Sequence, residues 1–442
     1  MKWPEEFLIR MQHYFGDDYE TFLNGLSTET PVSIRMNNRK QIPVKENSSP
    51  IPWSKEGYYL DKRPSFTIDP LFHAGCYYVQ EAGSQFLEQL FQLAIKDIPD
   101  PVVLDLCAAP GGKSTHLLSI MNGNGLLVSN EVIPSRNKVL QQNIAKWGFA
   151  NTIVTQNDSK DFNKAGELFD VIVVDAPCSG EGLFRRDPEA SNEWSVAAVG
   201  NCSVRQNEIL DNVHKALRPG GYLIYSTCTF ESVENEDQIN NLVANLGYEL
   251  CNNVNAENGV KKSNAGYHFY PHTTKSEGFF ISMLKKPDES HHIRIKEEKP
   301  KNSDRQSTNV LSEYFLNPEE LVSIVKDDRL YAFPKKHYSI FNYLMKKLFI
   351  RQTGIFVGNQ KEKNFIPSEE LALAIDLRKV IASVDVDLET ALNYLRCENI
   401  SLPGVATGWT IIKYQNFPLG WVKVLDRRVN NYFPKEWRIL KK

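Results

Sequence analysis

Two cysteines stand where the chain leaves successive predicted strands, and their setting indicates covalent chemistry. Cys178 lies in Asp175-Ala-Pro-Cys-Ser-Gly180, and Cys228 lies in Tyr225-Ser-Thr-Cys-Thr-Phe230, each shortly after an apolar run. A thiolate is a strong nucleophile, and covalent catalysis divides one difficult step into two easier ones. A single free cysteine is more often a small buried apolar residue, but two at neighbouring strand ends favour a chemical role.

The reaction that such a thiol suits is attack on carbon 6 of a cytosine. Carbon 5 of cytosine is a poor nucleophile, and addition of a thiolate to carbon 6 makes it an enamine-like carbon that can attack a methyl sulfonium. A carboxyl such as Asp175, if protonated or sharing a proton, could hydrogen-bond ring nitrogen 3 and stabilise the adduct. These residues alone do not decide whether Cys178 or Cys228 is the nucleophile.

A parallel sheet would bring these residues together, and the middle of the chain predicts one. Short apolar runs alternate with amphipathic stretches, which is typical of βαβ units in a doubly wound α/β fold with helices on both faces. The predicted strands are 102–106, 126–131, 152–158, 169–176, 221–228 and 279–284. The predicted helices are 114–121, 135–147, 196–217 and 233–246.

Four carboxylates and a loop of small residues mark the carboxyl edge of this predicted sheet, where ligands of open α/β sheets bind. Asp105, Glu131, Asp158 and Asp175 stand at the ends of the first four strands, and the loop Cys107-Ala-Ala-Pro-Gly-Gly-Lys113 follows the first. An acidic residue such as Glu131 suits a ribose diol. A nucleotide-phosphate loop is disfavoured because it requires glycine where Cys107 stands, and no GxGxxG motif follows the first strand.

The chain divides into four predicted segments. Residues 1–75 form an N-terminal extension, 76–286 the catalytic domain, 287–309 a polar linker, and 310–442 a small C-terminal α+β domain. In the last segment, strand-like runs at 354–357, 410–414 and 421–424 surround a helical pattern over 368–380.

Composition limits the partners and the location of the protein. The 442 residues carry a net charge of −3, so nucleic-acid binding requires local basic patches. The seven scattered cysteines include no CxxC pair, so reduced thiols without a disulfide framework or metal site are expected. With neither a long apolar run nor a signal-peptide pattern at the start, we expect a cytoplasmic protein that spans no membrane.

The central block resembles the two-cysteine RNA (cytosine-5)-methyltransferases of the nucleolar-protein and Sun type. The matching pieces are Asp105 with Cys107–Ser114, Glu131, Asp158, Asp175–Gly182, and Ser226–Phe230 with Glu234-Asn235-Glu236. The resemblance implies a Rossmann-like core that uses S-adenosyl-L-methionine, with Cys228 as nucleophile, Cys178 assisting product release and Asp175 in the catalytic set. The cofactor contacts it implies are Cys107, Ala108, Ala109, Pro110, Gly111, Gly112, Lys113, Glu131, Asp158 and Asp175.

The flanking segments resemble the bacterial RsmF-like branch of this family, which modifies small-subunit ribosomal RNA. Ser33–Asn37 and Tyr78–Glu81 are similar to its N-terminal extension. Gly408-Trp409, Pro418–Lys423, Tyr432–Pro434 and Trp437-Arg438 are similar to its C-terminal, PUA-like domain. Both would bind RNA, either as ribosomal RNA or within the 30S subunit.

Basic residues among aromatics are the predicted RNA contacts, because cations bind phosphate and aromatic rings can stack on splayed bases. They are Arg35 near the start and Lys423, Arg427, Arg428 and Arg438 in the tail. Three alternatives stay open: a transfer-RNA cytosine-5 methyltransferase, an RNA-binding protein with a silent catalytic core, and a methyltransferase for small molecules or proteins. The last would leave two strand-end cysteines without a purpose.

Overall fold

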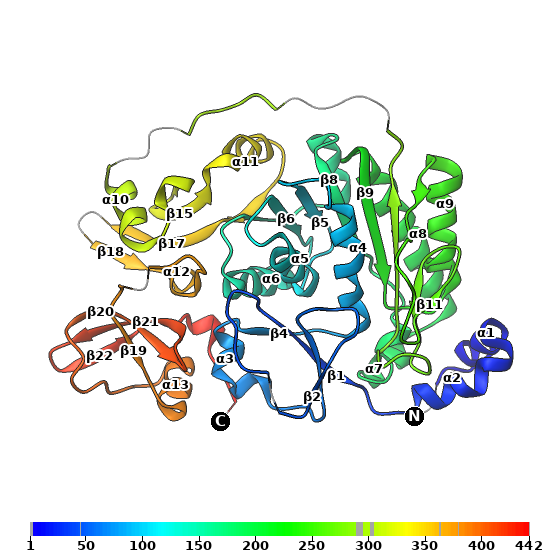
Figure 1. Cartoon of the computed structure of the whole chain (residues 1–442), viewed down its shortest axis with the longest axis horizontal. Helices are drawn as coiled ribbons and strands as arrows, with labels where there is room; N and C mark the ends of the chain where they lie inside the picture. The colour runs from blue at the N-terminus through cyan, green and yellow to red at the C-terminus, as the bar shows by residue number, and fades with distance from the viewer. Residues whose placement is uncertain are drawn as a thin grey trace.

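A ten-stranded, mostly parallel sheet forms the centre of the computed structural model (Figure 1). The structure describes residues 3–44, 46–288, 295–300, 305–361, 364–378 and 380–441. The strands run in the order β11-β12-β13-β9-β8-β5-β6-β7-β16, and β10 pairs with β13. Parallel strands at the centre of an open sheet confirm the predicted Rossmann-like core.

All six predicted strands of this sheet are present, with shifted ends. The five parallel strands are β5 (Val102–Asp105), β6 (Leu126–Asn130), β7 (Thr152–Thr155), β8 (Phe169–Asp175) and β9 (Leu217–Thr227). The antiparallel strands are β10 (Glu249–Leu250), β11 (Lys261–Lys262), β12 (Tyr267–Phe269), β13 (Phe279–Lys285) and β16 (Ile350–Thr353). β7 ends three residues before Asp158, so this carboxylate lies beyond the strand rather than at its end.

Helices cover both faces of the sheet, because successive strand side chains point to opposite sides. Leu104 and Ile172 pack in one core with side chains of α8 (Val196–His214), α9 (Glu236–Leu246) and α11 (Tyr338–Met345). Val103 and Val171 pack in the other with α4 (Leu87–Ala94), α5 (Gly112–Met121) and the end of α6 (Pro134–Trp147). The four predicted helices of this region are therefore present, as α5, α6, α8 and α9.

The N-terminal segment combines two helices with a small sheet of its own. The helices α1 (Glu5–Phe15) and α2 (Tyr19–Leu26) bury Phe7 and Phe22 against Phe184 and Trp194 of the catalytic region. The sheet has the order β2-β3-β1-β4, with β2 (Ser48–Pro50), β3 (Gly57–Leu60), β1 (Val32–Met36) and β4 (Tyr77–Val79). A short helix, α3 (Pro70–His73), precedes β4.

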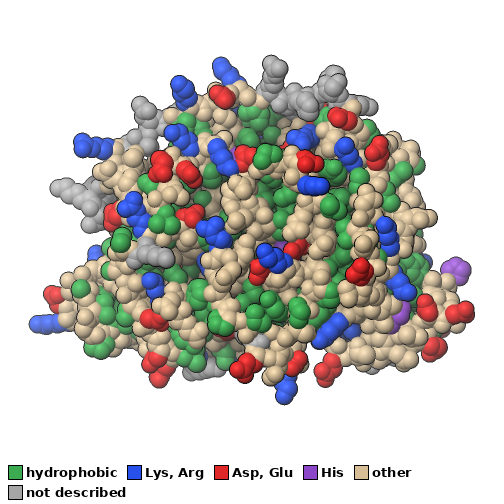
Figure 2. All heavy atoms as spheres, in the orientation of Figure 1, with side chains coloured by type: hydrophobic (Ala, Val, Ile, Leu, Met, Phe, Trp, Pro, Cys, Tyr) green, Lys and Arg blue, Asp and Glu red, His purple; other side chains and the backbone are tan. Residues whose placement is uncertain are grey.

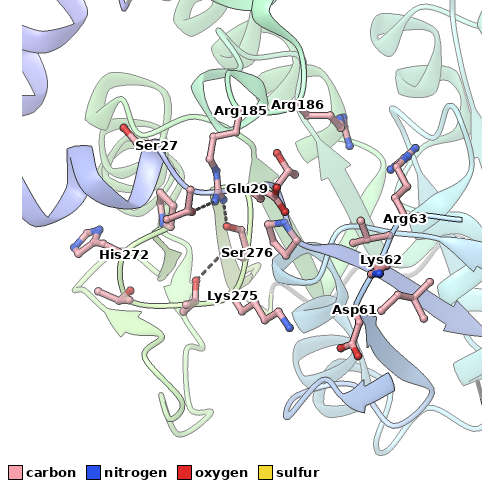
Figure 3. Close-up of a pocket in the computed structure, with 18 residues that line it drawn as sticks. Ser27, Glu29, Asp61, Lys62, Arg63, Arg185, Arg186, His272, Lys275 and Ser276 are labelled. Carbon is pink, nitrogen blue, oxygen red and sulfur yellow. Dashed lines mark hydrogen bonds between the residues drawn. The ribbon is translucent and has the colours of Figure 1, made fainter. Parts of the chain in front are cut away.

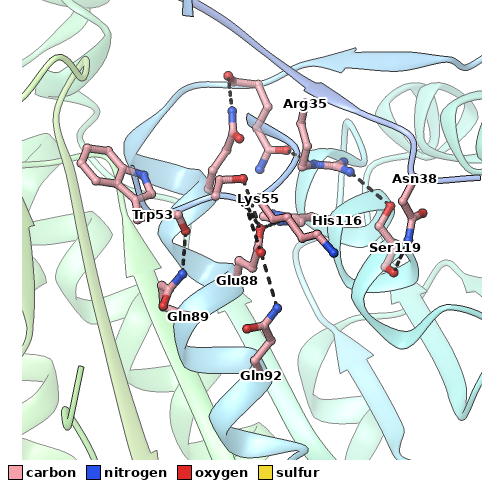
Figure 4. Close-up of polar contacts among 12 residues, drawn as sticks. Arg35, Asn38, Trp53, Lys55, Glu88, Gln89, Gln92, His116 and Ser119 are labelled. Carbon is pink, nitrogen blue, oxygen red and sulfur yellow. Dashed lines mark hydrogen bonds and ion pairs between the residues drawn. The ribbon is translucent and has the colours of Figure 1, made fainter. Parts of the chain in front are cut away.

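Arg35 on β1 is not available to RNA, so its prediction as a contact is wrong. Its side chain is fully buried, and the guanidinium lies 4.6 Å from the centre of the Trp147 ring. Its Nε donates to Gln80 Oε1 at 2.8 Å and its Nη2 to Thr115 Oγ1 at 2.7 Å. Its Nη1 donates to Ser119 Oγ at 3.4 Å, as Figure 4 shows. A buried cation with such partners ties β1 to α5, and a sequence pattern cannot distinguish this from an exposed basic residue.

The C-terminal segment forms two further four-stranded sheets. One has the order β14 (Leu321–Lys326), β15 (Arg329–Pro334), β17 (Ile355–Lys361), β18 (Asn364–Pro367), and α10 (Arg305–Tyr314) packs beside it. The other has the order β19 (Ser383–Asp385), β20 (Gly408–Tyr414), β21 (Phe417–Leu425), β22 (Arg428–Asn431), with α13 (Leu388–Leu395). The predicted α+β character is confirmed, but β16 leaves this segment to pair with β7 of the catalytic sheet.

The helix predicted over 368–380 is wrong beyond its first turns. It is the short α12 (Glu369–Leu373), after which Ala374 is extended. The backbone groups that would continue the helix bond elsewhere: Ile375 N donates to Gly148 O at 3.1 Å and Arg378 N to Tyr314 O at 2.9 Å. Long-range hydrogen bonds therefore override the local helical pattern. The predicted linker, 287–309, falls partly outside the described residues, and its last part is the start of α10.

On the molecular face drawn in Figure 2, basic and acidic side chains are interspersed rather than gathered into one field. This mixture of charges on the face that is drawn fits the small net charge of −3. Within the ranges that the structure describes, none of the helices combines the length and apolar character needed to cross a bilayer.

Candidate active site

A cavity of about 250 Å³ lies at the carboxyl ends of β5 and β8, beside the residues that follow β9. It brings together Cys228, Asp175 and most of the loop after β5, as predicted from the strand ends. The lining residues are Tyr78, Val79, Gln80, Glu81, Ser84, Cys107, Ala108, Ala109, Pro110, Gly112, Lys113, Asp175, Ala176, Leu183, Arg186, Cys228, Glu277, Gly278 and Phe279. Among the described residues, Gly111, Glu131, Asp158 and Cys178 do not line it.

Asp175 and Lys113 form an ion pair inside this cavity. Asp175 is the last residue of β8 and pairs in register with Ser226 of β9, whose hydroxyl donates to Asp175 Oδ1 at 2.8 Å. Lys113 Nζ lies 2.8 Å from Asp175 Oδ2 and 5.0 Å from the centre of the Phe279 ring. Lys113, predicted as a cofactor contact, thus also reaches the carboxyl that was predicted to be catalytic.

The two cysteines are in contact, although fifty residues of chain separate them. Their Sγ atoms lie 3.2 Å apart, and the backbone N–H of Cys228 donates to Cys178 Sγ at 3.4 Å. The hydrogen bond with Cys228, together with desolvation, raises the pKa of Cys178 well above its ordinary value. Cys178 is therefore a neutral thiol beside Cys228, and of these two cysteines Cys228 alone lines the cavity.

Gly182 explains how the Cys228 loop can come so close to the Cys178 loop. Its amide donates to Cys228 O at 2.9 Å. A Cβ at this position would lie 2.9 Å from Cys228 O and 2.6 Å from Gly278 O. Any larger residue would push the two loops apart, so the glycine of the Glu181-Gly182 pair is required by packing.

The loop Cys107–Lys113 suits one end of an adenosylmethionine molecule. Ala108 and Ala109 are small, and Gly112, the first residue of α5, packs so closely that a Cβ would lie 3.3 Å from the Tyr78 ring. Beneath the loop, Asp105 Oδ1 is a buried acceptor without a partner among the described residues. Small side chains and free amides at a helix start accommodate a polar ligand, so the residues present fit this cofactor.

Glu131 and Asp158 lie at the same edge but outside the cavity. Glu131 follows β6, is almost fully buried, accepts from Ile133 N at 2.9 Å, and lies 3.5 Å from Arg136 Nη1. Arg136 Nη2 also donates to Ala109 O at 2.8 Å, which links Glu131 to the loop after β5. Asp158 is exposed and caps the turn after it by accepting from Lys160 N at 3.1 Å. Cofactor contact by these two residues stays a prediction.

Several cavity residues were missed by sequence reasoning as part of the site. Glu277 and Gly278 immediately precede β13, and Leu183 and Arg186 follow the Cys178 loop. Burial beside Glu81 raises the pKa of Glu277 to about 7. In the sequence, a carboxylate and a glycine directly before an apolar strand could have indicated that Glu277 and Gly278 belong to the site. Only the antiparallel pairing of β13 with β9 brings them close to Cys228.

A buried carboxyl pair, Glu181 and Glu234, joins the two cysteine loops. Ser179 Oγ donates to Glu181 Oε1 at 2.7 Å and also hydrogen-bonds Glu234 Oε1, while Ser179 N donates to Glu234 Oε2 at 3.1 Å. One hydroxyl carries a single proton, so it cannot donate to two carboxylates at once. Burial raises the pKa of Glu234 to about 7 and raises the pKa of Glu181 as well, so this cluster holds an extra proton.

The free energy of unfolding should therefore decrease as pH rises, because Glu234 loses a proton that the folded state favours. Its folded pKa of about 7 exceeds the ordinary value of 4.5, so its contribution is complete below about pH 4.5 and is lost as pH rises to about 7. The shift corresponds to roughly 3 kcal/mol. The free energy of unfolding changes with pH, and Glu234→Gln should remove the contribution of one titrating group from this slope. Urea denaturation at a series of pH values measures the slope.

The matched control for this experiment is Glu208→Gln, an exposed residue on α8. Other buried carboxyls, such as Glu277 and Glu370, keep their own share of the slope in both variants. If Glu234→Gln and Glu208→Gln leave identical slopes, Glu234 holds no extra proton in the folded state.

The remaining predicted RNA contacts lie in or near the C-terminal sheet, and all are at least partly exposed. Arg427 and Arg428 are exposed at the turn between β21 and β22, and Arg438 is exposed near the end of the chain. Lys423 is half-buried, with Nζ 5.4 Å from the centre of the Trp409 ring. Their contact with RNA stays a prediction.

Fold and site together define an S-adenosylmethionine-dependent methyltransferase with two cysteines in contact at the carboxyl edge of its sheet. Three family models match: the N-terminal domain of 16S rRNA methyltransferase RsmF over residues 3–82, 16S rRNA methyltransferase RsmB/F over 92–285, and the methyltransferase RsmF PUA domain over 382–439. The ribosomal RNA small subunit methyltransferase F of Shewanella loihica is 31% identical and covers 94% of this chain and 88% of its own. The chain belongs to this methyltransferase F family.

Other relatives and solved structures agree. The methyltransferase F of Aliivibrio salmonicida is 28% identical over 98% of this chain and 97% of its own. A methyltransferase homologue from Pyrococcus horikoshii has a TM-score of 0.55 and 27% identity, covering 64% of this chain and 95% of its own. NSun6 from the same organism, solved with SFG, has a TM-score of 0.54 at 20% identity over 64% of this chain and 98% of its own, and shares the fold.

Proposed function

We propose that this protein methylates carbon 5 of a cytosine in small-subunit ribosomal RNA, with Cys228 as covalent nucleophile. The observation that carries the proposal is the position of Cys228 in a cavity that is also lined by most of the Cys107–Lys113 loop and by the Lys113–Asp175 ion pair. The names of the relatives supply the class of RNA. The reaction would take place in the cytoplasm, on naked RNA or on the 30S subunit.

In the first half of the reaction, the Cys228 thiolate forms a bond to carbon 6 of the cytosine. The electron pair of the ring double bond moves away from carbon 6, and ring nitrogen 3 takes a proton from the Lys113–Asp175 pair. Carbon 5 gains nucleophilic character. S-adenosylmethionine, when bound beside the loop after β5, supplies an electrophilic methyl group.

In the second half, the carbon-5 proton is removed by a base and the bond between Cys228 Sγ and carbon 6 breaks. The electron pair of that bond returns to the sulfur, while nitrogen 3 gives its proton back to the ion pair. Cys178 supports this step because its raised pKa keeps a proton on a sulfur 3.2 Å away, which can hydrogen-bond the departing thiolate.

The reacting base must leave its stack to reach Cys228, because carbon 6 of a cytosine inside a duplex is inaccessible. Gly278 and the aromatic ring of Phe279 line the same cavity as Cys228, which supports entry of a flat base. The catalytically silent alternative is disfavoured, since the two cysteines contact each other and Lys113 pairs with Asp175.

The test is methylation by the purified chain with tritiated adenosylmethionine. Small-subunit ribosomal RNA, assembled 30S subunits and bulk transfer RNA are offered separately, all lacking the modification. We expect label in 5-methylcytidine after nuclease digestion of the ribosomal samples. Label in transfer RNA alone would refute the proposed substrate, and label in any nucleoside other than 5-methylcytidine would refute the chemistry.

A further inference from the structure

A much larger cavity, about 1350 Å³, lies between the N-terminal segment and the catalytic region (Figure 3). Four stretches of chain line it: the residues between α2 and β1, the end of β3 with its following turn, the residues after the Cys178 loop, and the turn before β13. Small-molecule pockets usually measure about 300–1,000 Å³, so this one has room for a segment of a polymer.

Cations outnumber anions on its walls. Lys62, Arg63, Arg185, Arg186 and Lys275 line it, against the two carboxylates of Glu29 and Asp61. Figure 3 shows Arg63, Lys62 and Lys275 extending from two separate turns around one hollow. This surplus of positive charge, in a protein with a net charge of −3, suits a polyanionic ligand.

Arg185 belongs to the framework of the cavity and not to its free surface. It is buried, its Nη1 donates to Thr28 Oγ1 at 3.1 Å, and its Nη2 donates to Ser276 O. It thereby fastens the end of α2 to the turn before β13. Lys62, Arg63 and Lys275 are exposed instead, and within the described ranges none of the three forms an ion pair.

Arg186 connects this cavity to the catalytic one, because it lines both. Its side chain is half exposed, and Nη1 lies 3.3 Å from Glu277 Oε2, a residue of the catalytic cavity. A polyanionic polymer that lies in the large cavity would therefore pass Arg186 and place its next monomer in the cavity that Cys228 lines. Arg186 can contact a phosphate at the junction of the two cavities, while Glu277 holds the Arg186 side chain in position.

We propose that this cavity is the track for the RNA strand on one side of the target cytosine, with Lys62, Arg63 and Lys275 bound to successive backbone phosphates. The proposal rests on the proposed function, since it takes the substrate to be RNA. The track holds single-stranded RNA, because the target base must be unpaired to pass Arg186 into the catalytic cavity.

The test compares two triple variants that remove the same charge. One is Lys62→Ala, Arg63→Ala and Lys275→Ala; the control is Lys215→Ala, Lys326→Ala and Lys335→Ala, three exposed lysines outside the track. Binding of a fluorescein-labelled, single-stranded oligoribonucleotide with one cytosine is measured by anisotropy at several salt concentrations. Methyl transfer to the same RNA gives KM and kcat.

We expect the track variant to bind roughly tenfold or more weakly and its log–log salt dependence to flatten by about 2, at ~0.7 for each single-strand phosphate contact. KM for RNA should rise by a similar factor, with kcat at saturation and the affinity for adenosylmethionine unchanged. The control should resemble the wild type. Equal losses in both variants, or none in the track variant, would overturn the proposal.

The proposed function fails separately from this inference. If the wild-type protein binds the oligoribonucleotide but never methylates its cytosine, the proposed function is refuted. The track is still supported in that case if the track variant binds weakly and the control variant binds normally. If the wild-type protein methylates the RNA and the track variant binds it normally, the track is refuted and the proposed function stands.

Discussion

Replacement of Cys228 by serine should abolish methyl transfer, with kcat lowered by about 10⁴- to 10⁶-fold, the usual consequence of removing a covalent nucleophile. A serine hydroxyl is far less ionised than a thiol at neutral pH and cannot add to carbon 6 at a useful rate. Cofactor binding should persist, since the walls at the Cys107–Lys113 loop are untouched. Tritiated methyl transfer measures the first quantity and isothermal titration the second.

The matched control is Cys202→Ser, which changes a half-buried cysteine on α8 outside the cavity. It should retain wild-type turnover. Appreciable turnover by Cys228→Ser would show that another group attacks the base, and Cys178, 3.2 Å away, would then be the first candidate.

Replacement of Cys178 by alanine should trap the covalent protein–RNA adduct. The change leaves the nucleophile in place but removes the thiol that can hydrogen-bond its sulfur as the bond to carbon 6 breaks. Attack and methyl transfer should proceed, whereas release should slow by about two orders of magnitude or more, the size of effect expected for a lost proton-handling group. A retarded band on a denaturing gel, dependent on RNA and adenosylmethionine, is the measurement.

The double variant Cys178→Ala with Cys228→Ser provides the control for the adduct. It should give no retarded band, because the sulfur that bonds to the base is gone. A band that persists in the double variant would mean that the cross-link forms elsewhere, and absence of a band in Cys178→Ala would exclude the release role.

Strands and helices of the catalytic core could be read from the sequence because they follow local patterns. β5, β6 and β8 are continuous apolar runs, which is what burial on both faces requires, and the helices α5, α6, α8 and α9 follow them in the expected alternation. The loop Cys107–Lys113, Asp175 and Cys228 could be placed at one edge from the same reasoning, because the carboxyl ends of parallel strands share an edge.

The sequence by itself determined which chemistry is possible: two thiols and a carboxylate at neighbouring strand ends, beside a loop of small residues. Only the tertiary structure decided that Cys228 faces the cavity and Cys178 stands behind it, that Lys113 pairs with Asp175, and that Arg35 is a buried strut. The physical reason is the distance along the chain between the residues that interact. Strand and helix patterns depend on near neighbours, whereas burial, ion pairing and proton sharing depend on contacts between residues far apart in the chain.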